Sequence, residues 1–146
     1  MIDTKNMKNG FSMIEVLVGI ALIGTVLIGL AQLFTLSVMN NFRSSEISNA
    51  TFLAQQNIDY LRSLTGAELN NFPLVARGES NDEAIDINAD GTTDFRRLTR
   101  VTLNGAIYDI RVWVFPVTQR NTDVNELRDH PERHHVQAQI NTVISR

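Results

Sequence analysis

Oxygen-bearing side chains recur between residues 86 and 94, in the segment DINADGTTD. Their spacing matches the first nine positions of an EF-hand-type calcium loop, in which oxygen ligands stand at positions one, three, five, seven and nine and glycine at position six. The residues at those ligand positions are Asp86, Asn88, Asp90, Thr92 (through its backbone carbonyl) and Asp94. The sequence thus predicts a calcium ion with a structural role and an affinity in the ~10⁻⁴–10⁻³ M class.

Two features of this segment leave a second interpretation open. Position twelve, where a bidentate glutamate is expected, is Arg97, so a substitute ligand would have to come from Glu79, Asp82 or Glu83. Aspartate, asparagine and glycine also serve the backbone geometry of tight turns. An Asx-rich turn that leads into a strand therefore explains the same residues without a metal.

Three histidines, at positions 130, 134 and 135, suggest zinc at first sight, because His130 and His134 have the i,i+4 spacing of ligands on a helix. Pro131 disfavours a continuous helix there, and no third ligand follows at a suitable distance. We expect these histidines to be solvated loop residues.

Charge and composition exclude several classes of function. The chain has 146 residues, 16 acidic against 13 basic side chains, a formal charge of −3 and no cysteine. An acidic chain is not expected to bind nucleic acid, and we expect Arg96, Arg97 and Arg100 to form the solvent-facing side of a strand, paired with local acids. No nucleophile elbow, phosphate-binding loop or metal-hydrolase motif occurs, so we expect no enzymatic activity.

The N-terminal segment indicates a membrane anchor. A short polar stretch with Lys5 and Lys8 precedes residues 16–42, which carry no charge. Those 27 residues would form a helix of about 40 Å, which exceeds the ~30 Å hydrocarbon core of a bilayer. The lysines place the N-terminal end in the cytoplasm by the positive-inside tendency. We therefore expect one membrane crossing, with everything after residue 43 on the opposite side.

Glu15 directly precedes this uncharged stretch and lies inside the apolar segment that begins at Phe11. A carboxylate near the apolar boundary is costly unless it is solvated at headgroup depth or paired with a cation. A cut after Gly10 would create such a cation, the free α-amine of Phe11, which could meet Glu15 of a neighbouring subunit. Both the solvated and the paired arrangement are open at this point.

The segment from Gly10 to Val18, GFSMIEVLV, resembles the class III signal of type IV pilins and type II secretion pseudopilins. The resemblance implies that a membrane prepilin peptidase cuts after Gly10 and methylates the new N-terminal Phe11. It also implies that Glu15 supports docking between subunits. Among such proteins, the absence of a proline before Pro73 and of a C-terminal cysteine pair favours a minor pilin or pseudopilin over a major subunit.

The periodicity of the chain predicts an α+β fold. Apolar residues at helical spacing continue the apolar segment, so that one helix of about 80 Å is expected from about residue 12 to 65, ending at Thr65-Gly66. Strands are expected at residues 95–103 and 107–117, joined by an Asn104-Gly105 hairpin, and at 135–144. Residues 67–85 and 119–133 are expected to be loops. The helix would pack against this small antiparallel sheet.

Together these expectations describe a leader peptide (residues 1–10), a transmembrane and assembly half-helix (11–42) and a periplasmic head (43–146). The order of elements resembles V-type minor pilins, and the implied function is that of a structural subunit of a type IV pilus. The implied partners are prepilin peptidase, other pilins and the inner membrane. A minor type II secretion pseudopilin of the I type and a monomeric, membrane-anchored sensor of calcium or another ligand are the alternatives.

Overall fold

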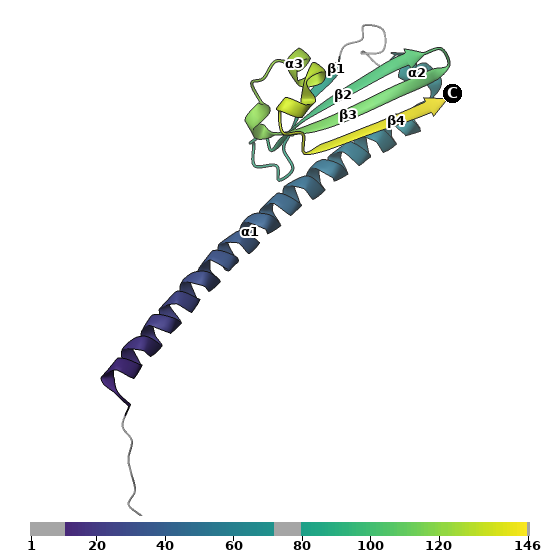
Figure 1. Ribbon diagram of the computed structural model, residues 1–146. Helices are drawn as coiled ribbons and strands as arrows, with labels where there is room; N and C mark the ends of the chain where they lie inside the picture. The colour runs from purple at the N-terminus through teal and green to yellow at the C-terminus, as the bar shows by residue number, and fades with distance from the viewer. Residues whose placement is uncertain (1–10, 72–79, 146) are drawn as a thin grey trace, which may run out of the picture. The chain divides into compact units, whose positions relative to one another are not determined.

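The computed structural model describes residues 11–71 and 80–145, and the chain divides into two units, Met1–Phe42 and Arg43–Arg146 (Figure 1). Helix α1 (Met13–Ser63) contributes to both units. The predicted helix from about residue 12 to 65 is thereby confirmed to within two residues. The α+β fold class is also confirmed, since the second unit contains a four-stranded antiparallel sheet.

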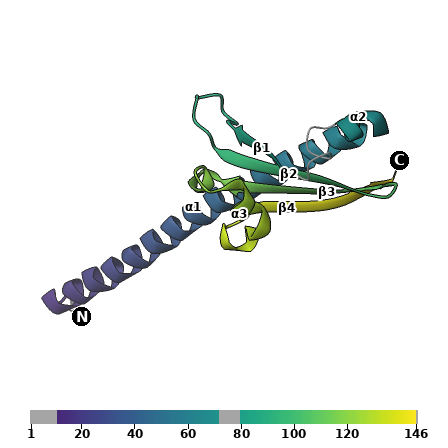
Figure 2. The same ribbon diagram turned by 90° about the horizontal axis from the view of Figure 1, so that it is seen from above.

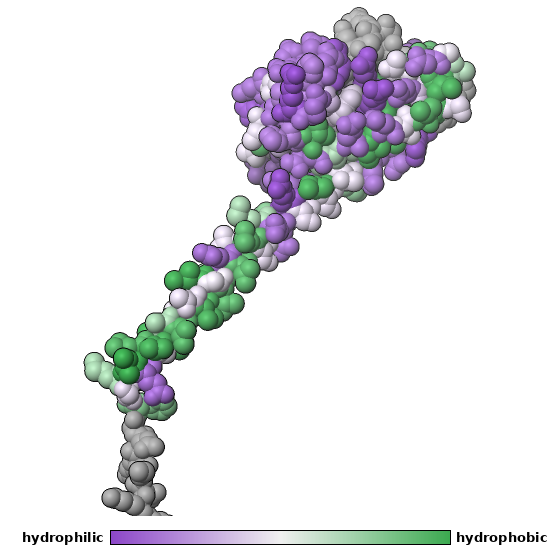
Figure 3. Space-filling model, in the orientation of Figure 1, coloured by the Kyte–Doolittle hydropathy of each residue, from purple (hydrophilic) through white to green (hydrophobic). Residues whose placement is uncertain are grey.

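The N-terminal part of α1 exposes apolar side chains along its length, and hydrophobic colouring covers most of the face of this helix that Figure 3 shows. An 18-residue window of this helix reaches a mean hydropathy of 2.5, and none of that window is buried within the protein. Among the described residues, α1 is the one helix long and apolar enough to cross a membrane. Soluble helices instead show an apolar stripe opposite a polar face.

The sheet is a simple meander of four strands, in the order β1-β2-β3-β4. The strands are β1 (Ser80–Ile85), β2 (Phe95–Asn104), β3 (Ile107–Pro116) and β4 (Ala138–Ser145). The predicted hairpin is confirmed: Asn104 pairs with Ile107, and Gly105 has a φ of +66°, a conformation that favours glycine.

The expectation that residues 67–85 form a loop is wrong for residues 67–71 and 80–85, while residues 72–79 lie outside the described residues. The expected number of three strands is also wrong. Helix α2 (Gly66–Asn71) begins at a capping box in which the Thr65 N–H and hydroxyl donate to Glu68, while the Glu68 N–H donates to the Thr65 hydroxyl. Strand β1 escapes detection because it is a polar edge strand whose acidic residues pair with arginines of β2.

The segment after β3 is also more ordered than expected. It contains the short helices η1 (Val117–Gln119), α3 (Val124–Asp129) and η2 (Pro131–Arg133). The Asp123 carboxylate caps α3 by accepting from the Asn125 N–H at 2.8 Å. Leu127 of α3 is completely buried, which explains why this segment folds onto the sheet.

Side chains of the sheet alternate between two hydrophobic cores. The inner face of the sheet packs against residues 50–61 of α1. The outer face lies on the opposite side of the sheet and packs against α3 (Figure 2). The inner core includes Ala50, Leu53, Ala54, Ile58, Leu61, Phe95, Val101, Tyr108, Ile110, Val112 and Val114. The outer core is smaller and consists of Leu98, Trp113, Phe115 and Leu127. The inner face also holds a buried hydrogen bond of 2.6 Å from the Asn57 amide to the Thr99 hydroxyl.

Candidate functional site

The predicted processing and assembly residues lie at the start of α1. Gly10 lies outside the described residues. Phe11 is 82% exposed, and the Ser12 carbonyl opens the helix by accepting from the N–H groups of Glu15 (2.9 Å) and Val16 (3.2 Å). Glu15 thus stands in the first helical turn, where the helix dipole favours a negative charge.

The Glu15 side chain is exposed and isolated in an apolar surface. Within residues 11–71 and 80–145 it makes no hydrogen bond or ion pair. Its neighbours Met13, Ile14 and Leu17 are 82%, 68% and 59% exposed. Residues 11–71 and 80–145 therefore supply neither a cation for this carboxylate nor a cover for the apolar side chains around it.

The acidic loop 86–94 connects β1 to β2 and is closed by a hydrogen bond from the Asp94 N–H to the Ile85 carbonyl, at 2.8 Å. The Asp86 carboxylate accepts from the Gly91 N–H and the Asp94 carboxylate from the Ile87 N–H, each at 2.8 Å. Gly91 has a φ of +85°, which favours glycine at the sixth position of the loop. These side chains therefore fold the loop through its own backbone.

Asp90 is the most engaged acid of this loop. Hydrogen bonds from the Thr92 hydroxyl and then from the Thr92 N–H hold the pKa of Asp90 below its ordinary value. The Asn88 carbonyl oxygen accepts from the Asp90 N–H at 3.2 Å, and the Asn88 amide donates to the Asp90 carboxylate at 3.0 Å. Asn88 and Asp90 thus form Asx-type turns, in keeping with the metal-free interpretation, whereas Asp86 and Asp94 accept from backbone N–H groups farther along the loop.

The upstream acids do not complete a ligand shell in this structure. Asp82 is paired with Arg96 and Glu83 with Arg97, while Glu79 lies outside the described residues. Within the described part of the chain, no group of three or more histidine, aspartate or glutamate side chains is placed to hold a metal ion. Asp86 and Asp94 each keep one carboxylate oxygen without a protein partner there. Calcium binding stays a prediction.

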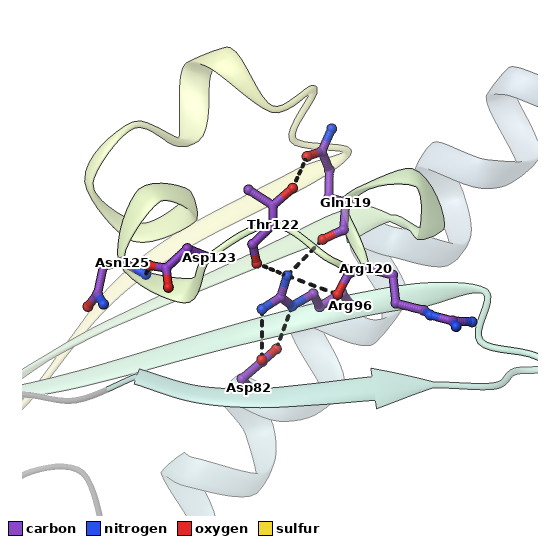
Figure 4. Close-up of polar contacts among 7 residues, drawn as sticks. All are labelled: Asp82, Arg96, Gln119, Arg120, Thr122, Asp123 and Asn125. Atoms are coloured by element: carbon purple, nitrogen blue, oxygen red, sulfur yellow. Dashed lines mark hydrogen bonds and ion pairs between the residues drawn. The ribbon is translucent and has the colours of Figure 1, made fainter.

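Arg96 forms a buried clamp that the sequence did not reveal (Figure 4). Its guanidinium binds both carboxylate oxygens of Asp82, with Nε–Oδ1 and Nη2–Oδ2 distances of 2.8 and 2.9 Å. Its Nη1 donates to the carbonyls of Gln119 at 2.7 Å and Thr122 at 2.6 Å. One side chain of β2 therefore ties β1 to the segment between η1 and α3.

Arg96 and Arg97 are paired with local acids, as expected, whereas Arg100 has no ion pair among the described residues, and the three arginines do not form a solvent-facing side. Arg96 is only 7% exposed. Arg97 points to the inner face, where its Nε donates to Glu83 at 3.0 Å and its Nη1 to the Leu53 carbonyl at 3.2 Å. Two adjacent acids that precede two adjacent arginines by 14 residues are the signal of this pairing across a hairpin.

The histidines do not converge on a metal site. His130 lies 3.5 Å from Glu132, and His134 is held by the Gln119 side chain at 3.1 Å and by Glu126 at 3.5 Å. The His134 side chain is 14% exposed, so it is not a solvated loop residue as expected. It instead packs beneath the segment after β3.

Comparison with known proteins gives one match. The profile described as the prokaryotic N-terminal methylation motif matches residues 5–31. No curated protein and no solved structure matches the chain significantly. The N-terminal segment therefore carries the signal of type IV prepilins, and the implied resemblance is confirmed for this part of the chain.

Proposed function

Because the chain carries the prepilin signal at the start of a long exposed helix, we propose that it is a minor pilin, a structural subunit of a type IV pilus. The signal and the α+β layout support a type IV pilin-like or pseudopilin protein. Such a protein is a structural subunit rather than an enzyme. Its partners are prepilin peptidase, which cuts after Gly10 and methylates Phe11, and the neighbouring pilins.

The observation that carries this proposal is the uncovered apolar surface of α1 between residues 13 and 42. Apolar surface contributes roughly 25 cal/mol per Å² when it leaves water, so an exposed helix of this length requires a cover. In the inner membrane, lipid supplies it, with the N-terminus in the cytoplasm and the head in the periplasm. In a filament, the same surface packs against the helices of other subunits.

Glu15 then selects the register of packing. Its carboxylate has no partner within the described chain, and an unpaired charge in apolar surroundings is costly. The methylated α-amine of Phe11 from a neighbouring subunit is a cation at a similar depth. Pairing neutralises both groups, and a subunit that is displaced along the helix axis loses this pairing.

Two measurements test the proposal. Mass spectrometry of the protein from its native membrane should find a chain that begins at N-methylated Phe11. Glu15→Ala should leave membrane insertion intact and reduce the amount of the protein in sheared pili. Glu46→Ala is the matched control, since Glu46 lies on the same helix, is exposed and stands outside the apolar stretch.

The outcomes separate the candidates. An intact Met1 with no crosslinks through residues 11–40 favours the anchored sensor of calcium or another ligand. A processed chain that is absent from pili and required for type II secretion favours the I-type pseudopilin. Equal incorporation of wild type and Glu15→Ala contradicts the assigned role of Glu15.

A further inference from the structure

A row of four polar side chains crosses the outer face of the sheet. In the strand register, Ser80 pairs with Arg100, Arg100 with Arg111, and Arg111 with Asn141. Paired residues of antiparallel strands project to the same side. Each of the four alternates with neighbours that face the inner core, so all four belong to the outer face. We call them the outer arginine row.

Of the two arginines at the centre of this row, only Arg111 has an ion pair among the described residues. Arg100 and Arg111 stand directly opposite each other, and like charges in this arrangement are destabilising. Arg111 has an ion pair of 3.2 Å with Asp109, and its side chain is 49% exposed. Arg100 is half-buried and forms no ion pair or hydrogen bond within residues 11–71 and 80–145.

One carboxylate that the charge of Arg100 does influence, that of Asp129, is already engaged. Both oxygens of Asp129 accept from Arg128, at 2.8 and 3.0 Å. These bonds hold the pKa of Asp129 below its ordinary value, and the charge of Arg100 adds to the effect. The Arg100 charge therefore reaches Asp129 only at long range and remains available to an external acceptor.

Unsatisfied donors gather on the same face. The Arg100 Nε, the Ser80 hydroxyl and the Trp113 indole N–H are buried and have no partner within the described part of the chain. Trp113 is only 3% exposed and is the diagonal neighbour of Arg100, one row away. Buried donors without acceptors are unfavourable, so residues 11–71 and 80–145 leave an acceptor missing on this face.

Exposed aliphatic side chains border the row. Val143, which pairs with Asp109, is 63% exposed, and Ile107 on the same face is 45% exposed. Arginine beside exposed apolar side chains is typical of protein–protein contacts. A free phosphate or a nucleic-acid backbone would leave the aliphatic side chains uncovered.

We propose that the outer arginine row is a docking site for an acidic segment of another polypeptide. A carboxylate of that segment lies between Arg100 and Arg111, and its aliphatic side chains cover Ile107 and Val143. A guanidinium can bind a carboxylate through two parallel N–H donors, which gives strong, oriented binding. This site requires neither processing of the N-terminus nor incorporation into a filament.

The single tryptophan makes the site directly observable, because Trp113 lies beside the row. The full chain in non-ionic detergent micelles is titrated with the capped pentapeptide Glu-Val-Glu-Val-Glu while its fluorescence is recorded. The probes for comparison are the same peptide with glutamine in place of glutamate, and sodium phosphate, all at equal ionic strength. The variants are Arg100→Gln, Arg111→Gln and, as matched control, Arg43→Gln, an exposed arginine on α1.

The expected result is a saturable change with the acidic peptide that is at least tenfold weaker in both Gln variants and unchanged in Arg43→Gln. Val143→Thr should weaken binding less than the Gln variants do. Arg100→Lys keeps the charge but loses the paired donors of the guanidinium, and it serves as a control for misfolding. Its affinity for the acidic peptide should lie between those of wild type and Arg100→Gln. Equal binding of the two peptides, saturation by phosphate with the same arginine dependence, or no saturable change would overturn the proposal.

Discussion

Replacing Arg96 with alanine should lower the free energy of unfolding of the second unit by about 2–4 kcal/mol. The Arg96 side chain is 8% exposed, and removal of one partner from a buried ion pair costs about 3–5 kcal/mol. Asp82 is 33% exposed, so water restores part of its solvation and reduces the loss. The carbonyls of Gln119 and Thr122 also lose a charged donor, which keeps the effect well above that of a surface pair.

The assay is a urea titration of the full chain in detergent micelles, followed by the fluorescence of Trp113. This residue lies in the outer core, beneath the segment that the clamp holds. Limited trypsin digestion provides a second readout, because Arg120, Arg128 and Arg133 become accessible once that segment detaches from the sheet.

Three variants separate the clamp from a general effect of losing an arginine. Arg120→Ala removes an exposed arginine of the same segment and should change stability by less than about 0.5 kcal/mol. Arg96→Lys keeps the charge but cannot reach all the acceptors, so its loss should be intermediate. A double-mutant cycle with Asp82→Asn isolates the pair. A loss for Arg96→Ala below about 1 kcal/mol, equal to a surface pair, would refute this reasoning.

Two further predictions concern the acidic loop. The pKa of Asp90 is lowered in the folded protein, so its contribution to stability is present above the unfolded pKa of about 3.9 and is lost as the pH falls through the lower folded pKa. Asp90→Asn should therefore make the decline of the free energy of unfolding below about pH 4 shallower, as measured by urea titrations. An equally steep decline in wild type and variant would contradict this. Calcium at about ten times a Kd of the 10⁻⁴–10⁻³ M class should stabilise the protein by roughly 1 kcal/mol. Calcium should then raise the melting temperature of wild type but not that of Asp86→Asn, and magnesium should not raise that of wild type. An equal rise in all three measurements would exclude the loop as the site.

Much of the fold could be predicted because its signals are local. The hairpin at Asn104-Gly105 requires only a turn sequence between two strands, and the apolar stripe of α1 repeats at helical spacing. These elements lie where the sequence places them, with boundaries shifted by a few residues.

The elements that were missed depend on partners distant in the sequence. Strand β1 has few apolar residues. Its acids are accommodated because Arg97 stands opposite Glu83, and Arg96 is the diagonal neighbour of Asp82. Leu127 is the one fully buried residue of helix α3, and it anchors this helix. The burial of Arg96 depends on main-chain carbonyls 23 and 26 residues away. Because every residue has such a carbonyl, the residue types do not reveal these partners.

The sequential meander has a consequence for the order in which the second unit folds. Strands β2 and β3 pair through a tight turn, and β1 and β2 pair through the loop 86–94. Docking of the helix instead joins residues 42 to 44 positions apart, as between Asn57 and Thr99 or Leu53 and Arg97. Hairpins close before contacts that span long loops, since loop closure costs more entropy with length. During synthesis, residues 50–61 of α1, which face the inner core, are therefore made some forty residues before the strands that pack against them. A chain that stops before residue 138 keeps the β2-β3 hairpin and leaves the edge of β3 unpaired, as a template for aggregation.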